Sequence, residues 1–164
     1  MPRKQARKWD EAGSAGENAR AQLPAVAGAY FREGRKLLAG SPSPDDLHGF
    51  RLKTKRLRYT LELFRPCYSS PLEQRLEALR EVQTLLGDLN DCVAAERIAS
   101  NALPPKSQAY VRIASFVNAR GNKLVAAFRK HWKENFDAPG REDWWVGYLA
   151  KGKFRAPRRT DKSS

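Results

Sequence analysis

A row of basic residues marks the segment HGFRLKTKRLRYTLELF, which spans residues 48–64. If this segment is a helix that turns by about 100° per residue, one narrow sector of it carries His48, Arg51, Lys55 and Arg58. We call these four residues the cationic ridge. Like charges three and four residues apart destabilise an isolated helix by roughly a few tenths of a kcal/mol per pair, and Glu62 offsets only part of this. A ligand with several negative charges in a row would offset the rest, so the ridge predicts a polyanion-binding site.

The predicted helix carries apolar residues on both sides of the ridge. One flank is a broad apolar face made of Leu47, Phe50, Leu57, Leu61 and Phe64. The other flank is smaller and consists of Leu52, Tyr59 and Leu63. We therefore expect the ridge to line a groove or channel rather than face bulk water, unless one flank is left exposed. The remaining bases of the segment, Lys53 and Arg56, point elsewhere on the helix.

The stretch 105–136 supplies further candidates for the same groove. Arg120 falls within its apolar stripe, where a charge has to be paired or has to reach a cavity. Lys123 and Lys130 lie on the shoulder of that stripe. In the preceding stretch, Asp88 and Asp91 either orient these basic side chains or form surface salt bridges, and the sequence leaves both interpretations open.

The helices that must position these residues can be predicted from their start and stop signals. Four helical stretches are expected, over residues 17–39, 43–64, 70–101 and 105–136. Ser43 before Pro44 predicts an N-cap, and the segment Ser-Pro-Leu-Glu at residues 70–73 predicts a capping box. No alternating stretch rich in β-branched residues predicts a strand. The expected fold class is therefore all-α, an antiparallel four-helix bundle.

Two apolar stripes are expected to form the core of this bundle. They comprise Leu72, Leu76, Leu79, Val82, Leu86, Leu89 and Val93 in the third stretch, and Ala109, Ile113, Phe116, Val117, Leu124, Ala127 and Phe128 in the fourth. Gly87 interrupts the third stretch, where glycine costs about 1 kcal/mol relative to alanine. A close helix crossing or the approach of a ligand would explain it.

Composition limits the function classes. The chain of 164 residues has 31 Lys+Arg against 18 Asp+Glu, a net charge of +13, which favours anionic partners. No apolar run is long enough for a membrane span, the N-terminus lacks the apolar region of a secretory signal, and the two cysteines fit no metal spacing. We expect a cytoplasmic protein without a metal or cofactor. With only two histidines and no glycine-rich phosphate loop, we also expect it not to be an enzyme.

We divide the chain into a flexible basic N-terminus at residues 1–16, a helical bundle at 17–136 and a basic tail at 137–164. The tail contains four aromatic residues, which is too many for a merely solvated segment: Trp144, Trp145, Tyr148 and Phe154. They dock either on the bundle or on a second chain.

Three segments resemble a known family, the conserved histidine α-helical domain or CHAD domain. The segment at residues 48–64 is similar to its signature helix, LREVQTLLGDLNDCVAA at 79–95 to the next helix, and FVNARGNKLVAAFRKHW at 116–132 to a later one. The resemblance covers roughly residues 43–136. It implies an all-helical domain that holds inorganic polyphosphate in a basic channel, with possible association with polyphosphate granules. His48, Arg51, Lys55 and Arg58 would then be the phosphate contacts.

Other bases complete the set of candidate polyphosphate contacts, although they lie off the ridge: Arg56, Arg120, Lys123 and Lys130. A chain of phosphates carries a charge at each unit, so regularly spaced Lys and Arg can bind it without reading a sequence. The alternative is a non-specific nucleic-acid-binding protein, because basic helices and an aromatic, basic tail would also serve that function.

The chain departs from the CHAD pattern in one respect. The family usually has two four-helix halves, each with its own histidine-bearing helix, whereas only one such helix occurs in this sequence. His131 lies in the fourth stretch without the accompanying Arg and Lys spacing. The sequence therefore resembles one half of the domain, most like the second. We expect a homodimer, in which two chains pair about a two-fold axis to rebuild the channel.

Overall fold

Serine side chains cap the N-termini of three of the helices. In the computed structural model, which describes residues 9–152, the hydroxyls of Ser14, Ser43 and Ser107 each accept a hydrogen bond from a backbone N–H three residues later. Ser43 was predicted as a cap, and Asp46 completes its capping box. Ser14 was not predicted, and it starts the first helix two residues earlier than expected.

The described residues form five α-helices and one short 3-10 helix, without strands, so the all-α prediction is confirmed for this part of the chain. The elements are α1 (Ala15–Leu38), α2 (Pro44–Leu63), η1 (Arg65–Cys67), α3 (Pro71–Ala102), α4 (Gln108–Asn135) and α5 (Arg141–Lys151). The fifth helix, α5, was not predicted. None of the described helices is long and apolar enough to cross a membrane.

The capping box predicted at Ser70 is wrong. Ser70 has helical backbone angles, and its side chain makes no capping hydrogen bond. The carboxylate of Glu73, which would have completed the box, instead accepts a hydrogen bond from Arg65 Nε at 2.6 Å. Glu73 therefore forms an ion pair with Arg65 of the 3-10 helix η1 and does not cap the start of α3.

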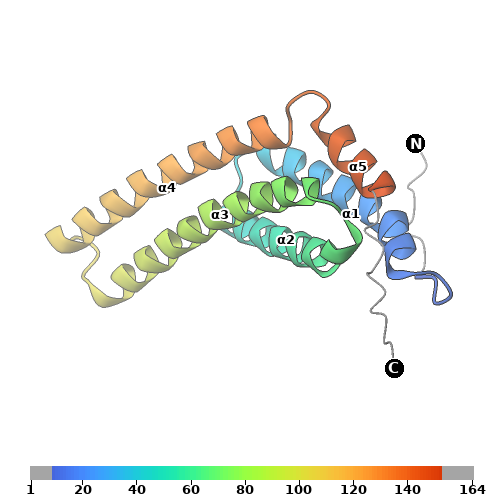
Figure 1. The fold of residues 1–164 in the computed structure, drawn as a ribbon. Helices are drawn as coiled ribbons and strands as arrows, with labels where there is room; N and C mark the ends of the chain where they lie inside the picture. Colours follow the sequence, from blue (N-terminus) through green and yellow to red (C-terminus); the bar gives the residue numbers. More distant parts are fainter. Residues whose placement is uncertain (1–8, 153–164) are drawn as a thin grey trace.

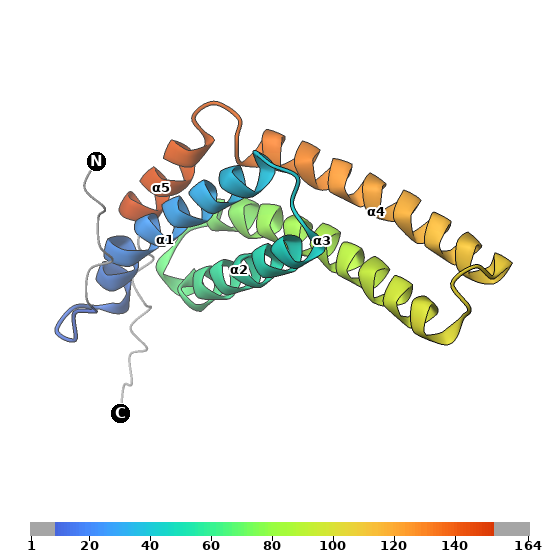
Figure 2. The same cartoon turned by 180° about the vertical axis from the view of Figure 1, so that it is seen from behind.

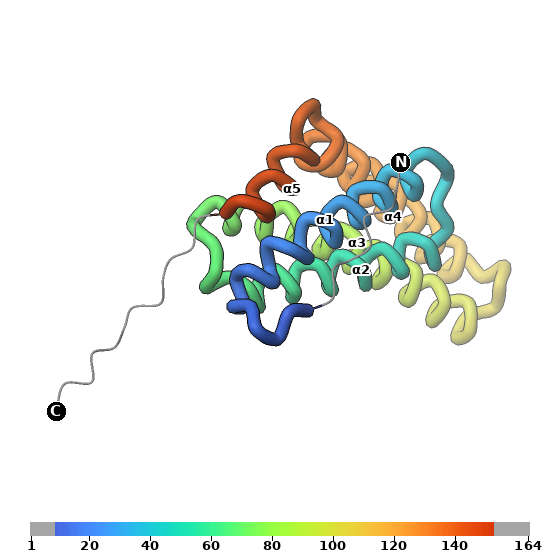
Figure 3. Tube along the Cα trace, turned by 90° about the vertical axis from the view of Figure 1, so that its right-hand side faces the viewer, coloured from blue at the N-terminus to red at the C-terminus, as the bar shows by residue number. Residues whose placement is uncertain are grey.

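The two longest helices, α3 and α4, pack against each other as an antiparallel pair. Helix α3 packs against α4 on one side and α2 on the other, while α1 packs against α2 and α5 (Figure 1). The turn between α3 and α4 lies well beyond the ends of α1 and α2, so the C-terminal part of α3 and the N-terminal part of α4 project as a two-helix hairpin (Figure 2). The tube view shows α5 alongside α1, at the other end of the molecule (Figure 3).

The apolar stripes follow this arrangement. The predicted core residues of α3 are buried from Leu72 to Leu89, whereas Val93 is exposed. On α4, Val117 and Phe128 are buried, but Ile113 and Phe116 are exposed, Phe116 to 69%. The stripe prediction is thus wrong for the projecting hairpin, because neither α1 nor α2 extends far enough to cover it.

Aromatic rings fill the core at the other end. Trp132 stacks on Phe136 with ring centroids 4.5 Å apart, and Tyr30 stacks on Phe50 at 4.9 Å. Trp132 also lies against the backbone of α1 at Gly34, where an added Cβ would overlap the indole ring. Glycine at this position therefore allows the indole ring of Trp132 to pack directly against the backbone of α1.

Helix α5 is anchored by an arginine. The side chain of Arg75 is fully buried, and its guanidinium lies 3.4 Å from the ring centroid of Trp144 and 3.9 Å from that of Tyr148. It donates hydrogen bonds to the carbonyls of Pro71 and Trp144, and burial lowers the pKa of Arg75 to about 10. Three of the tail aromatics therefore dock on their own chain, whereas Phe154 lies outside the described residues.

Candidate anion-binding site

The cationic ridge lies along the seam between α2 and α3. His48 Nδ1–H donates to Asn90 Oδ1 at 2.9 Å, and Arg58 Nε–H donates to Gln83 Oε1 at 2.9 Å. Between them, the guanidinium of Arg51 lies over Gly87, where an added Cβ would be 3.5 Å from Arg51 Nε. The α3 partners of these three ridge residues are uncharged, so the seam orients the basic side chains without neutralising them.

Gly87 lies opposite the side chain of Arg51. The glycine leaves space on α3 for the guanidinium of Arg51, which crosses over it from α2. The atoms nearest to an added Cβ belong to the side chain of Arg51 and not to a helix backbone, so a close helix crossing does not explain Gly87. A single Cβ at this position would make an ordinary van der Waals contact, so alanine would also leave room for the arginine, whereas a larger side chain would not.

The two flanks of the ridge differ in exposure. Leu47, Phe50, Leu57 and Leu61 are buried in the core, as expected. The other flank is exposed: Leu52 to 49%, Tyr59 to 50% and Leu63 to 74%. Within the described chain, the ridge therefore has an apolar wall on one side only, and the second side of the expected groove is open.

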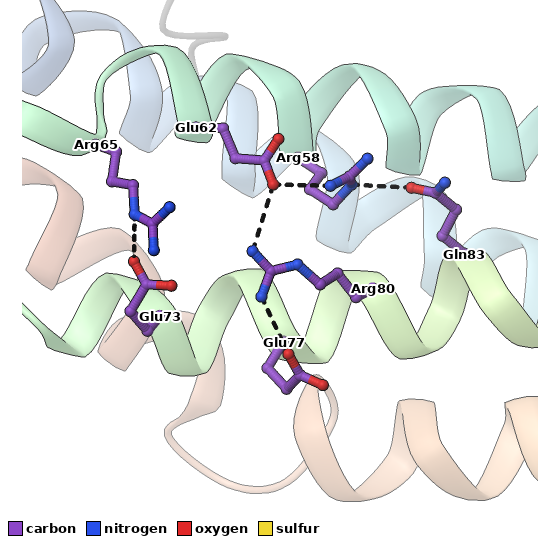
Figure 4. Close-up of polar contacts among 7 residues, drawn as sticks. All are labelled: Arg58, Glu62, Arg65, Glu73, Glu77, Arg80 and Gln83. Carbon is purple, nitrogen blue, oxygen red and sulfur yellow. Dashed lines mark hydrogen bonds and ion pairs between the residues drawn. The ribbon is translucent and has the colours of Figure 1, made fainter.

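One end of the ridge is neutralised by acids. Arg58 Nη1 pairs with Glu62 Oε1 at 2.7 Å, and the same carboxylate contacts Arg80 Nη2 at 3.4 Å (Figure 4). Arg80 also pairs with Glu77 at 3.1 Å, and these two acids raise the pKa of Arg80, the hydrogen bond with Glu77 first. Sequence reasoning missed Arg80, which faces the ridge from α3; its three-residue spacing from Glu77 was the available signal.

The middle of the ridge is different, because its charges have no acid partner. Among the described residues, Arg51 forms no hydrogen bond or ion pair through its guanidinium, and its Nε is buried without a partner. The ammonium of Lys55 lies 5.8 Å from the ring centroid of Tyr59 and pairs with no acid in the same part of the chain. A buried donor without a partner is unfavourable by about 1–3 kcal/mol. Because Arg51 and Lys55 have no acid partner among the described residues and Arg58 has one, the positive charge of the ridge that is not neutralised lies mainly at Arg51 and Lys55.

The other candidate residues lie apart from this pair. Arg120 is exposed and pairs with Asp88 at 3.6 Å, which makes that contact a surface salt bridge. Lys123 and Lys130 are exposed on α4, and both α4 and α2 pack against α3. Arg56 is exposed on α2. Among the described residues no hydrogen bond or ion pair joins these four bases to the ridge, and their part in phosphate binding stays a prediction.

Lys53 and His131 are accounted for by structural contacts. Lys53 pairs with Glu33 of α1 at 2.7 Å, away from the ridge. His131 Nε2–H donates to the carbonyl of Ala78 at 3.0 Å, and its Nδ1 accepts from Asn135 Nδ2 at 3.1 Å. Both ring nitrogens of His131 are thus used within the fold, whereas in His48 only Nδ1 has a partner within the described residues.

The fold and the ridge together define an all-helical domain with a candidate linear anion site. The chain belongs to the CHAD domain family, whose family model matches residues 3–100. This family is associated with polyphosphate binding and consists in general of binding rather than catalytic domains. The match contains the whole ridge and its partners on α3, but not α4. No curated protein and no solved structure matches the chain.

Proposed function

We propose that this chain binds inorganic polyphosphate along the cationic ridge. One observation carries the proposal: Arg51 and Lys55 are half-buried in the α2–α3 seam without an acid partner among the described residues. Three other bases do have such partners, namely Lys53, Arg58 and Arg120. A chain of phosphates supplies adjacent negative charges to Arg51 and Lys55, with arginine binding two oxygens and lysine acting as a point charge.

The ridge binds its ligand without converting it. His48 serves as a further contact, since its Nδ1–H bond to Asn90 fixes the ring and leaves Nε2 for the ligand. Arg58 contributes less than Arg51 and Lys55, because Glu62 and Gln83 already occupy its guanidinium. We place the protein in the cytoplasm, at polyphosphate granules.

A second copy completes the groove. We propose that α1 to α4 act as one four-helix half and that two chains pair about a two-fold axis. The exposed flank of Leu52, Tyr59 and Leu63 supplies an apolar contact surface directly beside the ridge. Pairing there gives the ridge its missing wall, and the polyanion between the two chains offsets the repulsion of their basic residues.

The test is a titration with long-chain polyphosphate and with DNA of matched total charge, at several salt concentrations. Arg51→Ala with Lys55→Ala should weaken polyphosphate binding by about tenfold to a hundredfold, because two charge-assisted contacts are lost. The matched control is Lys53→Ala with Arg56→Ala, which removes the same charge from the same helix off the ridge. Its loss should be less than about threefold.

Two outcomes would contradict the proposal. Equal losses in both double variants would mean that binding follows net charge rather than the ridge. Equal affinity for polyphosphate and DNA, with a steep salt dependence, would favour the nucleic-acid-binding alternative. Sedimentation of the protein with and without polyphosphate tests the dimer, and a strict monomer that binds tightly would exclude it.

A further inference from the structure

A cavity of about 330 Å³ opens at the His48 end of the ridge. It lies between the first turns of α2 and the middle of α3, where the hairpin begins to project. Its lining consists of Pro44, Asp45, Leu47, His48, Leu86, Leu89, Asn90, Val93, Ala94 and Arg97. A larger cavity of about 560 Å³, between α1 and α2, is lined by three acids against two bases, Lys36 and Lys53, and Lys53 already pairs with Glu33.

The cavity at His48 combines an apolar floor with a polar rim. Leu47, Leu86 and Leu89 are buried at the floor, and Val93 is partly exposed beside them. Sites for small organic molecules combine apolar walls with a few polar groups that set the orientation of the ligand. Inorganic polyphosphate has no apolar part, so the proposed function leaves this floor unused.

The rim has donors and acceptors suited to a nitrogen heterocycle. Asn90 uses its Oδ1 to accept from His48, which leaves both hydrogens of its amide nitrogen available. Among the described residues, the guanidinium of Arg97 pairs with no acid, and a planar guanidinium can stack on an aromatic ring. The carboxylate of Asp45 repels phosphate but accepts hydrogen bonds from an exocyclic amine.

His48 belongs to both the cavity and the ridge. One turn further along α2, Arg51 begins the stretch of positive charge without acid partners, which continues to Lys55. A ligand whose ring occupies the cavity can therefore extend a phosphate chain along the ridge, away from Asp45. The geometry requires an apolar, hydrogen-bonding head and a linear anionic tail.

We propose that the cavity and the ridge together bind a nucleoside polyphosphate, with the base in the cavity and the phosphates at His48, Arg51 and Lys55. This inference rests on the proposed function, because it uses the same ridge for the phosphate chain. It adds the head-group site and assigns Asn90 and Arg97 to it.

Calorimetric titration of the full chain with ATP and with inorganic tripolyphosphate tests the inference. Both probes carry three linked phosphates, and only ATP carries a base. ATP should bind about tenfold more tightly or better, the change expected from a small number of added contacts. Arg97→Gln should reduce ATP binding to the level of tripolyphosphate, whereas Arg112→Gln, an equal charge change on exposed α4, should not.

A second pair of variants separates the cavity from the ridge. Val93→Phe should fill the cavity and remove the ATP preference while tripolyphosphate binding stays unchanged. Val111→Phe is the control, since Val111 is an exposed valine outside the cavity. The inference is overturned if ATP binds no better than tripolyphosphate or if the two valine variants behave alike. Long-chain polyphosphate binding without ATP binding would overturn only this inference, whereas loss of both would overturn the proposed function as well.

Discussion

The two ends of the molecule differ in how completely the chain covers them. At the α1–α5 end, aromatic rings from α1, α4 and α5 pack on one another, with Phe31, Phe136 and Trp145 almost fully buried. We call this the closed end. At the other end, the α3–α4 hairpin projects with Ile98 and Phe116 largely exposed (Figure 1). The ridge begins beside the hairpin at His48, and one of its flanks is open. We call this the open end.

The closed end contributes mainly to the stability of the fold, whereas the open end carries the surfaces proposed for binding. The closed end buries most of the large side chains and fixes the orientation of α1, α4 and α5. The open end keeps charge and apolar surface accessible, which is favourable only if a ligand or partner covers them. Changes at the closed end should therefore act on folding, and changes at the open end on binding.

The largest expected effect is at Gly34, in the closed end. Gly34→Ala forces its new Cβ into the indole of Trp132, which neighbouring rings prevent from moving. We expect the free energy of unfolding to fall by about 3 kcal/mol or more, measured by urea denaturation. Gly49→Ala is the control, because nothing lies within 4 Å of its added Cβ, and it should gain up to about 1 kcal/mol. Similar stability of both variants would mean that the indole of Trp132 does not pack against Gly34.

Arg75→Lys should have the next largest effect. Lysine cannot place a planar group between Trp144 and Tyr148, nor reach both carbonyls that the arginine binds. We expect a loss of about 1–3 kcal/mol, with faster hydrogen exchange in α5 than elsewhere. Arg65→Lys, at an exposed ion pair, should change stability by less than about 0.5 kcal/mol. Uniform exchange across the chain would show that Arg75 is not specific to α5 docking.

A change at Gly87 should affect binding more than folding. Gly87→Leu displaces the guanidinium of Arg51 from the seam, so polyphosphate affinity should fall by about tenfold. Gly87→Ala makes only an ordinary contact with that arginine, so its affinity should stay near that of the wild type. Titration of both variants decides this point. Wild-type affinity in the leucine variant would show that the position of Arg51 is unimportant.

The smallest effect on stability is expected on the open flank. Leu63→Ser should change the free energy of unfolding of the monomer by less than about 0.5 kcal/mol, because Leu63 is exposed. The same variant should weaken the proposed dimer, as measured by sedimentation with polyphosphate. Phe116→Ser, also exposed but on α4, should leave the dimer unchanged. A dimer that survives Leu63→Ser would place the contact surface elsewhere.

Local signals predicted much of the fold. The start of α2 at Ser43 follows from capping hydrogen bonds within a few residues. The apolar stripe of α3 follows from a short-range periodicity. Both signals are local, so they do not depend on how the helix packs in the fold. The capping box predicted at Ser70 was wrong, and the carboxylate of Glu73 pairs instead with Arg65, eight residues earlier in the chain. The stripe prediction was wrong for the first half of α4 because a periodic apolar stripe indicates a face that can be covered, not whether another helix reaches it.

The sequence by itself determined the all-α class, the ridge on one face of α2 and the family. The pair of Arg58 with Glu62, four residues apart on α2, follows from the sequence. Only the tertiary structure decided that Arg51 and Lys55 stay without acid partners among the described residues, because this depends on which side chains of α3 face them. It also placed His48 beside Asn90 and Arg97, forty or more residues away along the chain. Periodicity fixes the face of a helix, whereas the packing of α2 on α3 decides what that face meets.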